Sequence, residues 1–494
     1  MVGRFQQLVL LAQQQQHYNY GRCGSIVRTK TKRCVVGFPV WQDGYGGGFC
    51  PKVVKLPPLH ASVSGAGGAQ YSEQLVDART RKRKKRIADV DQDELLDPTQ
   101  LADPDSCFCE FNGVHIHHKV YNAETEADNA PESQSGSQLS RHDSRKLGLP
   151  MILLHGFGAS VFSWNRVMKP LAELIGSKVL AFDRPAFGLT SRVDSFLHLS
   201  LGNEDAKPLN PYSMAFSVLA TLYFIDFLAA EKVVLVGHSA GSLVAVNAYF
   251  EAPERVAALI LVAPAIFAPL GVRKIKEGTK TGTNTTTEGD ESDSTRLWKP
   301  FMQLLEGLTK LAKTIAQMIV QMVMGMANML NSWYKKALAA FLRSALGVML
   351  IRMLIDKFGV AAVRTAWYDS KQLSDDVLNG YTKPLRAKGW DKALAEFTAA
   401  TLANMESESK PPLSNRLHEI SCPVLIITGD NDRIVPTWNA KRLAQAIPGA
   451  CLEIIKNCGH LPHEEKVEEF VSIVDKFLQR VCGDQKELSA QAAA

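Results

Sequence analysis

From Leu149 onward, short apolar runs alternate with longer segments in which apolar residues recur every three or four positions. The short runs predict buried strands, at 150–155, 179–183, 233–237, 257–262, 424–428 and 451–456. The longer segments predict amphipathic helices, at 161–175, 212–230, 243–250, 437–446 and 464–480. Apolar strands that alternate with such helices predict an α/β fold, with a mostly parallel, doubly wound sheet covered on both faces.

A hairpin is predicted just before this alternation. Two runs, 108–111 and 114–121, are separated by Asn112-Gly113, a pair that favours a two-residue turn. Ordered structure is therefore expected to begin near Cys107, and 107–265 to form the first part of the core. The second run carries three histidines, but no carboxylate or cysteine completes a ligand set, so we expect no metal there.

A long interruption at 266–405 is expected to be a helical lid inserted into the core. Its stretch at 276–296 is polar, which predicts a flexible insert. From 297 to 403 the pattern is helical, and the uncharged run 314–334 is long enough to cross a membrane. Several Gln, Asn and Ser residues interrupt that run, so lid helices are favoured. Membrane-surface contact through 314–354 and a membrane span are the alternatives.

The N-terminal region differs from the core in charge. Residues 1–72 contain eight Lys and Arg against one acid, Asp43, whereas the whole chain of 494 residues has a formal charge of +6. The remainder is therefore close to neutral, which gives no reason to expect nucleic-acid binding. A basic, acid-poor leader of this kind is typical of an organelle transit peptide, and a disordered tail is the alternative.

Two further segments complete the expected organisation. Residues 73–106 hold the basic run 79–86 followed by several acids, which predicts a charged, disordered linker. The second part of the core is expected over 406–482, with a tail at 483–494. The nine cysteines are an odd number without the paired spacing of a zinc site, a usage typical of a reducing compartment. We expect no disulfide, metal or cofactor.

A candidate nucleophile follows the strand predicted at 233–237. In Gly237-His238-Ser239-Ala240-Gly241, glycines stand two positions before and two after Ser239. A serine hydroxyl is a weak nucleophile, and a sharp turn from strand to helix lifts it to where a base can reach it. Crowding in such a turn explains the glycines. Ser239 is therefore the predicted nucleophile, and a plain tight turn is the alternative.

A second turn, His155-Gly156-Phe157-Gly158, stands at the end of the first core strand. It would let the backbone N–H of Phe157 join that of Ala240 in an oxyanion hole, which stabilises charge on a carbonyl oxygen during reaction. A plain glycine-rich turn is the alternative.

An acid and a base are offered by loops that follow later strands. Asp430 and Asp432 come after the strand at 424–428, and His460 and His463 come after the last strand. An imidazole in this position has to reach the serine on one side and a carboxylate on the other. The chain order of serine, acid and histidine is the one expected when such a sheet carries a catalytic triad.

These motifs resemble those of the α/β-hydrolase superfamily from about 107 to 480. In that superfamily the acid directly precedes a short stretch ending in Val-Pro, which matches Asp432 and makes Asp430 the less favoured choice. The loop 459–465 is similar to the family's G-H-x-x-x-x-E pattern, which identifies His460 as the base and His463 as the fallback.

Another part of the resemblance lies after the second core strand. Asp183 to Ser191 is similar to the family's D-x-P/R-G-x-G-x-S segment, with Ala186 in place of the usual glycine. The superfamily carries its lid between the nucleophile and the acid, where the long helical interruption lies here. A carboxylate replaces the serine in epoxide hydrolases and haloalkane dehalogenases, so Ser239 argues against both.

The resemblance implies a serine hydrolase that cleaves a carboxylic ester through an acyl-enzyme. The methionines of the lid would suit a bulky, flexible apolar substrate, and Trp164 and His238 are weaker candidates for the substrate pocket. Thioester, amide and carbon–carbon hydrolysis use the same triad and stay open, as does a membrane-associated, non-catalytic role. The chain also resembles plant-type plastid hydrolases with long leaders, which implies a chloroplast location, with mitochondrion or cytoplasm as alternatives.

Overall fold

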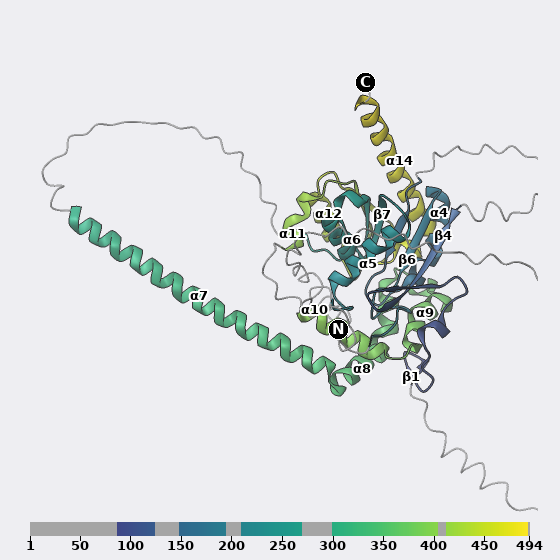
Figure 1. The fold of residues 1–494 in the computed structure, drawn as a ribbon, viewed down its shortest axis with the longest axis horizontal. Helices are drawn as coiled ribbons and strands as arrows, with labels where there is room; N and C mark the ends of the chain where they lie inside the picture. Colours follow the sequence, from purple (N-terminus) through teal and green to yellow (C-terminus); the bar gives the residue numbers. More distant parts are fainter. Residues whose placement is uncertain (1–85, 124–147, 194–208, 269–298, 404–411, 493–494) are drawn as a thin grey trace, which may run out of the picture. The chain divides into compact units, whose positions relative to one another are not determined.

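The structure, a computed structural model, describes residues 86–123, 148–193, 209–268, 299–403 and 412–492 (Figure 1). The leader at 1–72 and the polar insert at 276–296 lie outside these residues and stay predictions. The separate tail predicted at 483–494 is wrong up to Ala492, because helix α14 (Val467–Ala492) continues through it. The Gln, Lys, Glu, Leu and Ala residues of this stretch favour a helix.

Eight strands form one sheet in the order β10-β9-β8-β7-β5-β6-β4-β3. Their bounds are β3 Cys107–Phe111, β4 Val114–Asn122, β5 Met151–Leu154, β6 Lys178–Phe182, β7 Val233–His238, β8 Val256–Val262, β9 Val424–Gly429 and β10 Cys451–Ile455. Strands β5 to β10 pair in parallel, and β3 and β4 form an antiparallel edge. The predicted mostly parallel α/β sheet and its edge hairpin are therefore confirmed.

The strand order places a switch point at the centre of this sheet. From β5 the chain moves to β6 on one side, and from β7 it moves through β8 and β9 to β10 on the other. In open parallel sheets, ligands bind beyond the carboxyl ends of the strands at such a switch point. The turns that follow β5 and β7 carry the predicted oxyanion donors and the predicted nucleophile.

Helices cover both faces of the sheet, as predicted. The helices α5 (Met214–Phe227), α6 (Ala240–Glu251) and α12 (Thr437–Ala446) pack on one face, and α4 (Asn165–Ile175) and α14 pack on the other. Alternate residues of β5 enter the two cores: Ile152 and Leu154 the first, Met151 and Leu153 the second. All four are fully buried, which is why such strands are continuous apolar runs in the sequence.

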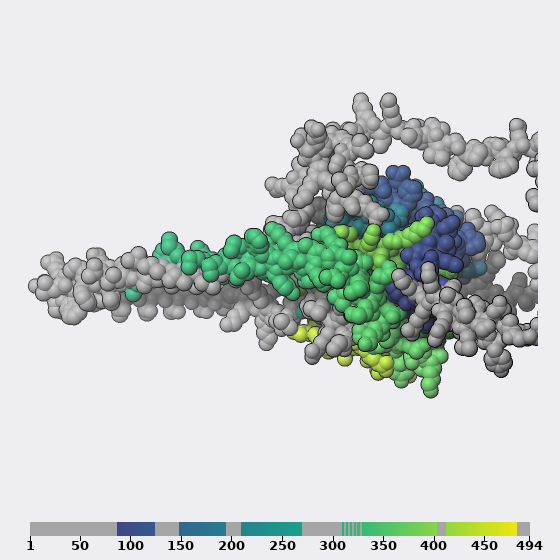
Figure 2. All heavy atoms as spheres, turned by 90° about the horizontal axis from the view of Figure 1, so that it is seen from below, coloured from purple at the N-terminus to yellow at the C-terminus, as the bar shows by residue number. Residues whose placement is uncertain are grey.

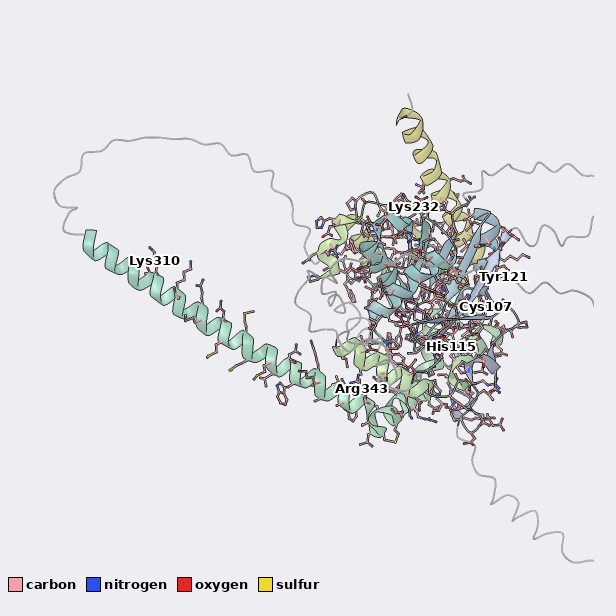
Figure 3. All side chains as sticks on the ribbon, viewed as in Figure 1. Cys107, His115, Tyr121, Lys232, Lys310 and Arg343 are labelled. Atoms are coloured by element: carbon pink, nitrogen blue, oxygen red, sulfur yellow. The ribbon has the colours of Figure 1, made fainter. Side chains whose placement is uncertain are left out.

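Between β8 and β9 most of the described residues are helical. The longer helices are α7 (Lys299–Arg343), α8 (Ala345–Ala366), α9 (Asp375–Thr382) and α10 (Trp390–Ala403), and the 3-10 turn η6 (Lys383–Arg386) precedes α10. The helix is interrupted between α7 and α8 at Ser344. The Ser344 hydroxyl accepts the N–H of Gly347 and caps α8. Arg343, labelled in Figure 3, ends α7 and forms an ion pair with Glu396 of α10.

Among the described residues, no single helix is long and apolar enough to cross a membrane. The segments Met324–Arg343 and Ala345–Ala366 reach that length and composition only as a pair, and the pair is bent by 75°. Several apolar side chains of this pair face outward, and Trp333 is 70% exposed.

The disordered linker predicted at 73–106 is wrong from Arg86 onward. The strands β1 (Arg86–Ile87) and β2 (Val90–Asp91) form a short antiparallel hairpin, and a 3-10 turn, η1 (Pro98–Leu101), follows. We call residues 86–106 the N-terminal strap. It contacts α8 and η6, and Figure 2 shows this purple segment beside the green helices. The strap is ordered by contacts with distant parts of the chain and not by a local hydrophobic pattern. One such contact is the hydrogen bond from the N–H of Ala88 to the side chain of Asp356, 268 positions away.

Candidate active site

Ser239 stands at the turn between β7 and α6, with φ 50° and ψ −116°. This backbone conformation is strained for a residue with a side chain, and such strain is concentrated at functional turns. Two hydrogen bonds to the chain around the end of β8 hold it: the Ser239 N–H donates to the Val262 carbonyl at 2.8 Å, and the Ser239 carbonyl accepts the Ala265 N–H at 3.1 Å. The strained serine is thus held at the carboxyl end of the central strands.

The glycines on either side of Ser239 are required by close packing. A Cβ atom on Gly237 would lie 2.6 Å from the Cα of Ser242, and one on Gly241 would lie 2.1 Å from the carbonyl oxygen of Leu154. No side chain fits at these distances, so α6 approaches β5 and β7 through glycine alone. The crowding predicted from the sequence is present.

His460 and Asp432 are brought together by the loops after β10 and β9. His460 Nδ1 lies 2.7 Å from Oδ2 of Asp432. The other carboxylate oxygen accepts the backbone N–H groups of Ile434 and Val435, at 2.8 and 2.9 Å. A carboxylate only accepts hydrogen bonds, so it favours the tautomer with the proton on Nδ1 and the lone pair on Nε2. That tautomer suits a general base.

Asp430, the less favoured acid, has other partners. It accepts the backbone N–H of Cys458 at 3.4 Å and lies 3.8 Å from Nζ of Lys456. These contacts tie the loop after β9 to the loop after β10. Only Asp432 of the two acids contacts His460.

His463, the fallback base, is packed below the turn. Its ring lies 4.2 Å from that of Trp164, and neither ring nitrogen has a hydrogen-bond partner among the described residues. Burial lowers the pKa of His463 to about 3, so the ring is neutral. Trp164 was predicted as a pocket residue, and this is wrong: it is fully buried in the core between the sheet, α4 and α14. Val161, which belongs to the same turn η2 (Val161–Trp164), faces the same core.

Glu465 positions the base loop, which is the loop that carries His460. The sequence motif includes this glutamate but does not explain its role. Its Oε1 accepts the two N–H groups that flank His460, at 2.9 and 3.3 Å, and its Oε2 accepts the N–H of Tyr368 at 2.8 Å. The N–H of His460 itself donates to the carbonyl of Ala366 at 2.7 Å. The loop that carries the histidine is therefore attached to the C-terminal end of α8.

The two N–H groups predicted as oxyanion donors lie at the same edge of the sheet. Ala240 is the first residue of α6, where an N–H has no acceptor within the helix. The turn with Phe157 is held by His155, whose Nδ1 donates to the Gly156 carbonyl at 2.7 Å while its Nε2 accepts the Arg184 N–H at 3.0 Å. Burial lowers the pKa of His155 to about 4, so the ring is neutral, as this donor and acceptor pattern requires.

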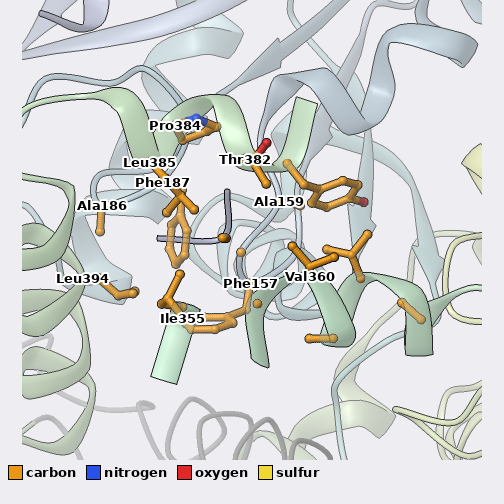
Figure 4. Close-up of a pocket in the computed structure, with 18 of the residues that line it drawn as sticks. Phe157, Ala159, Ala186, Phe187, Ile355, Val360, Thr382, Pro384, Leu385 and Leu394 are labelled. Carbon is orange, nitrogen blue, oxygen red and sulfur yellow. The ribbon is translucent and has the colours of Figure 1, made fainter. Parts of the chain in front are cut away.

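A cavity of about 190 Å³ is lined by Ser239 and His460 together with mostly apolar side chains. Figure 4 labels several of the apolar ones, Phe157, Phe187, Ile355 and Leu385 among them. Phe157 and Phe187 come from the core, and Ile355 and Val360 come from α8. His238 also lines it, as predicted. Other lining residues from α9, η6 and α10 are Tyr381, Thr382, Pro384, Leu385, Trp390 and Leu394. Arg192 is the one Lys, Arg, Asp or Glu residue in the described lining.

Five of the methionines that were expected to suit the substrate lie elsewhere, on α7. Each is 51–63% exposed and none of the five lines the cavity: Met318, Met322, Met324, Met326 and Met329. The helical insert contributes its apolar lining from α8, η6 and α10 instead. The expectation failed because a helical pattern does not tell which of several helices faces the site.

A buried hydrogen bond connects α9 to the loop after His460. The Tyr381 hydroxyl donates to Oε1 of Glu464, which is 3% exposed. Burial raises the pKa of Glu464 to about 8, so this carboxyl group is protonated at neutral pH. Tyr381 also lines the cavity, which makes this contact part of the roof over the site.

Two of the three histidines of β4 lie in different environments. His117 is buried, with Nδ1 2.7 Å from Asp183 and Nε2 2.8 Å from the Ser106 hydroxyl, while His115, labelled in Figure 3, is exposed. No group of three or more His, Cys, Asp or Glu residues that could hold a metal ion is found in the part of the chain that the structure describes.

Comparison with known proteins relates the sequence of this chain to those of hydrolases. The profile of the alpha/beta hydrolase family matches residues 151–473. An uncharacterized hydrolase of Bacillus subtilis is 22% identical over 67% of this chain and 89% of its own length. A 2-hydroxy-6-oxononadienedioate/2-hydroxy-6-oxononatrienedioate hydrolase of Pseudomonas putida is 23% identical over 70% of this chain and 94% of its own. A thermophilic esterase from Thermogutta terrifontis, of known structure, is 16% identical with a TM-score of 0.43, over 76% of this chain and 98% of that one.

Proposed function

Because the chain belongs to the alpha/beta hydrolase family, we propose that it is a serine hydrolase that cleaves a carboxylic ester of a bulky apolar compound. Ser239 is the nucleophile, His460 the general base and Asp432 the acid that orients the histidine. The observation that carries the proposal is their arrangement. A strained serine and a histidine held by a carboxylate at 2.7 Å line one mostly apolar cavity.

The reaction follows from this arrangement. Ser239 Oγ attacks the ester carbonyl carbon while its proton passes to Nε2 of His460. The resulting oxyanion accepts hydrogen bonds from the N–H groups of Phe157 and Ala240. Collapse of the tetrahedral intermediate breaks the bond to the alcohol, which leaves with the proton from His460. Water then attacks the acyl-enzyme with the same base, and the carboxylic acid is released.

The lining of the cavity supports an apolar substrate. Phenylalanine and aliphatic residues dominate it, and they bind hydrocarbon by removing it from water. The helices at 345–403 form the roof of this cavity, so we interpret them as the lid expected from the sequence. A lid of this kind excludes water and selects substrates by shape.

Carbon–carbon bond hydrolysis is the second candidate, because several relatives are named as hydrolases of dioates. A dioate carries two carboxylates, whereas Arg192 is the one cation in the described lining, the histidines apart. Its guanidinium already donates to the carbonyls of Phe187, Gly188 and Thr190, at 2.6–2.9 Å. The charge of the cavity therefore favours a neutral ester over a dioate.

The experiment that tests the proposal is labelling with a fluorophosphonate, followed by a series of nitrophenyl esters of increasing acyl length. We expect the label on Ser239 and hydrolysis that favours the longer chains. A 2-hydroxy-6-oxodienoate, supplied in parallel, separates the two reactions. Labelling without ester hydrolysis, but with cleavage of the dienoate, would transfer the function to the second candidate. No labelling at all would refute a serine hydrolase.

Contact with a membrane surface through 314–354 is a finer part of the proposal. Trp333 and Tyr334 are 70% and 66% exposed on α7, and Lys335 and Lys336 follow them. Exposed aromatic residues beside lysines favour the interface of an anionic bilayer. Co-sedimentation with anionic vesicles tests this, and binding should fall in Trp333→Ser. A chloroplast location, proposed from the leader, is tested by fusing residues 1–72 to a fluorescent protein.

A further inference from the structure

The tip of the strap hairpin takes part in the cavity that holds Ser239. Ala88 stands at the turn between β1 and β2, is 7% exposed and lines the cavity. Ala88 and Asp89 have φ values of 48° and 64°, the conformation of a tight two-residue hairpin turn. The residues on either side of the turn, Ile87 and Val90, are paired across the hairpin. A segment that precedes the family core thus supplies a residue to the site.

The tip is fixed to the helices that roof the cavity. The N–H of Ala88 donates to Oδ1 of Asp356 on α8 at 2.9 Å. Ile87 is 6% exposed and belongs to an apolar cluster with Ile351 of α8 and Trp390 of α10. These contacts hold the Ala88 methyl group in place, because both the backbone of the turn and the side chain before it have defined partners.

The rest of the strap joins the roof to the sheet. Gln92 accepts the indole N–H of Trp390 at 3.1 Å and donates to the Leu385 carbonyl at 3.3 Å. Further on, the carboxylate of Asp103 forms ion pairs with Lys383 of η6 and with Lys119 of β4. One chain segment therefore contacts the cavity, the helical insert and the edge of the sheet in turn.

The strap tip and the loop that carries His460 are attached to α8 at different points. Ala88 is bonded to Asp356, and His460 is bonded to Ala366, ten residues further along the same helix. At about 1.5 Å per residue, these points are separated by about 15 Å along the helix axis. The attachment of Ala88 is thus about three helical turns of α8 away from that of the catalytic histidine.

We propose that the strap hairpin forms the distal wall of the substrate cavity and that Ala88 sets the length of the apolar group it accepts. This rests on the proposed function, since the apolar group belongs to the ester cleaved at Ser239. A long group reaches the wall and contacts the methyl group of Ala88. A short group fills only the part near Ser239, so its binding does not depend on the residue at position 88.

The test substitutes Ala88 with a larger, polar residue that tolerates a positive φ. Asparagine meets both conditions. In Ala88→Asn, kcat/KM for nitrophenyl laurate should fall by roughly tenfold while that for the acetate stays within about twofold, because a buried amide lowers affinity only where the substrate reaches it. Asp89→Asn is the matched control: it places the same residue at the other, exposed turn position and should change neither rate.

Calorimetric binding of laurate to Ala88→Asn and Asp89→Asn separates this inference from the proposed function. Weaker laurate binding in Ala88→Asn alone would support the wall even if the wild-type chain cleaved no ester. Equal chain-length profiles in the two variants, or equal laurate binding, would overturn it. If Ala88→Asn does not fold, Ala88→Gly carries the test: the ratio of laurate to acetate rates should rise, and an unchanged ratio would count against the wall.

Discussion

Replacing Glu464 with glutamine should make the protein more stable at alkaline pH. Glu464 is 3% exposed, accepts a hydrogen bond from Tyr381, and has a pKa raised by burial to about 8. In the unfolded chain the same carboxyl group has its ordinary pKa of 4.5. Glutamine has nearly the same shape and keeps an oxygen that accepts from Tyr381, but it cannot ionise.

The sign follows from the two pKa values. Between pH 4.5 and about 8 the unfolded state releases this proton and the folded state keeps it, so the free energy of unfolding decreases as pH rises. The slope is about 1.4 kcal/mol per pH unit, which amounts to on the order of 4 kcal/mol over the whole interval. Above about pH 8 both states are ionised at this position, and its contribution becomes constant. Glu464→Gln removes this slope.

Urea unfolding at several pH values between about 5 and 9 measures the effect. The wild-type free energy of unfolding should fall across this range by on the order of 4 kcal/mol more than that of Glu464→Gln. Glu468→Gln, an exposed position on α14, is the control and should follow the wild type. If the wild type and Glu464→Gln showed the same pH dependence, the carboxyl group would be ionised in the folded state and the reasoning wrong.

Three other predictions concern the candidate site. Ser239→Ala should abolish fluorophosphonate labelling and ester hydrolysis while the thermal unfolding midpoint stays close to that of the wild type, since alanine keeps the backbone hydrogen bonds that hold the turn; retained hydrolysis would exclude Ser239 as nucleophile. Asp432→Asn should lower kcat by about 10⁴-fold and Asp430→Asn by less than about threefold, and the reverse ranking in steady-state kinetics would give the role to Asp430. Glu465→Gln should lower kcat more than it raises KM and should shift the pH–rate profile, because an amide has one acceptor oxygen and cannot serve both the two N–H groups beside His460 and the N–H of Tyr368. An unchanged profile would mean that the carboxylate does not position the base.

The sheet and the reacting residues were predictable because each depends on nearby sequence. Buried parallel strands are continuous apolar runs, and the turn at Ser239 requires glycines two positions away, so both leave a local pattern. The pairing of His460 with Asp432, and not with Asp430, was taken from a motif. The structure gives its physical basis in the two backbone N–H groups that hold the other oxygen of Asp432.

The strap and the lining were not predictable in the same way. Residues 86–106 are rich in charge and lack a period, yet Gln92 and Asp103 are held by partners on η6 and α10 that no local pattern reveals. Trp164 was assigned to the cavity as a side chain that would suit a bulky apolar substrate, and its packing in the core was not foreseen. Burial inside a core depends on which faces of distant elements meet, and a local pattern in the sequence does not reveal this.

Ala88 lies on a different part of the chain from the residues that carry out the reaction, so substrate preference and chemistry can evolve separately. The part of the chain that matches the family profile begins at Met151, so the wall of the cavity lies on a segment that the family core does not include. A lineage can therefore alter or exchange that segment while the sheet, the serine turn and the base loop stay as they are. Relatives with the same core can therefore differ in the substrates they accept. The substrate of one relative is then a weak guide to the substrate of another, even where both catalyse the same reaction.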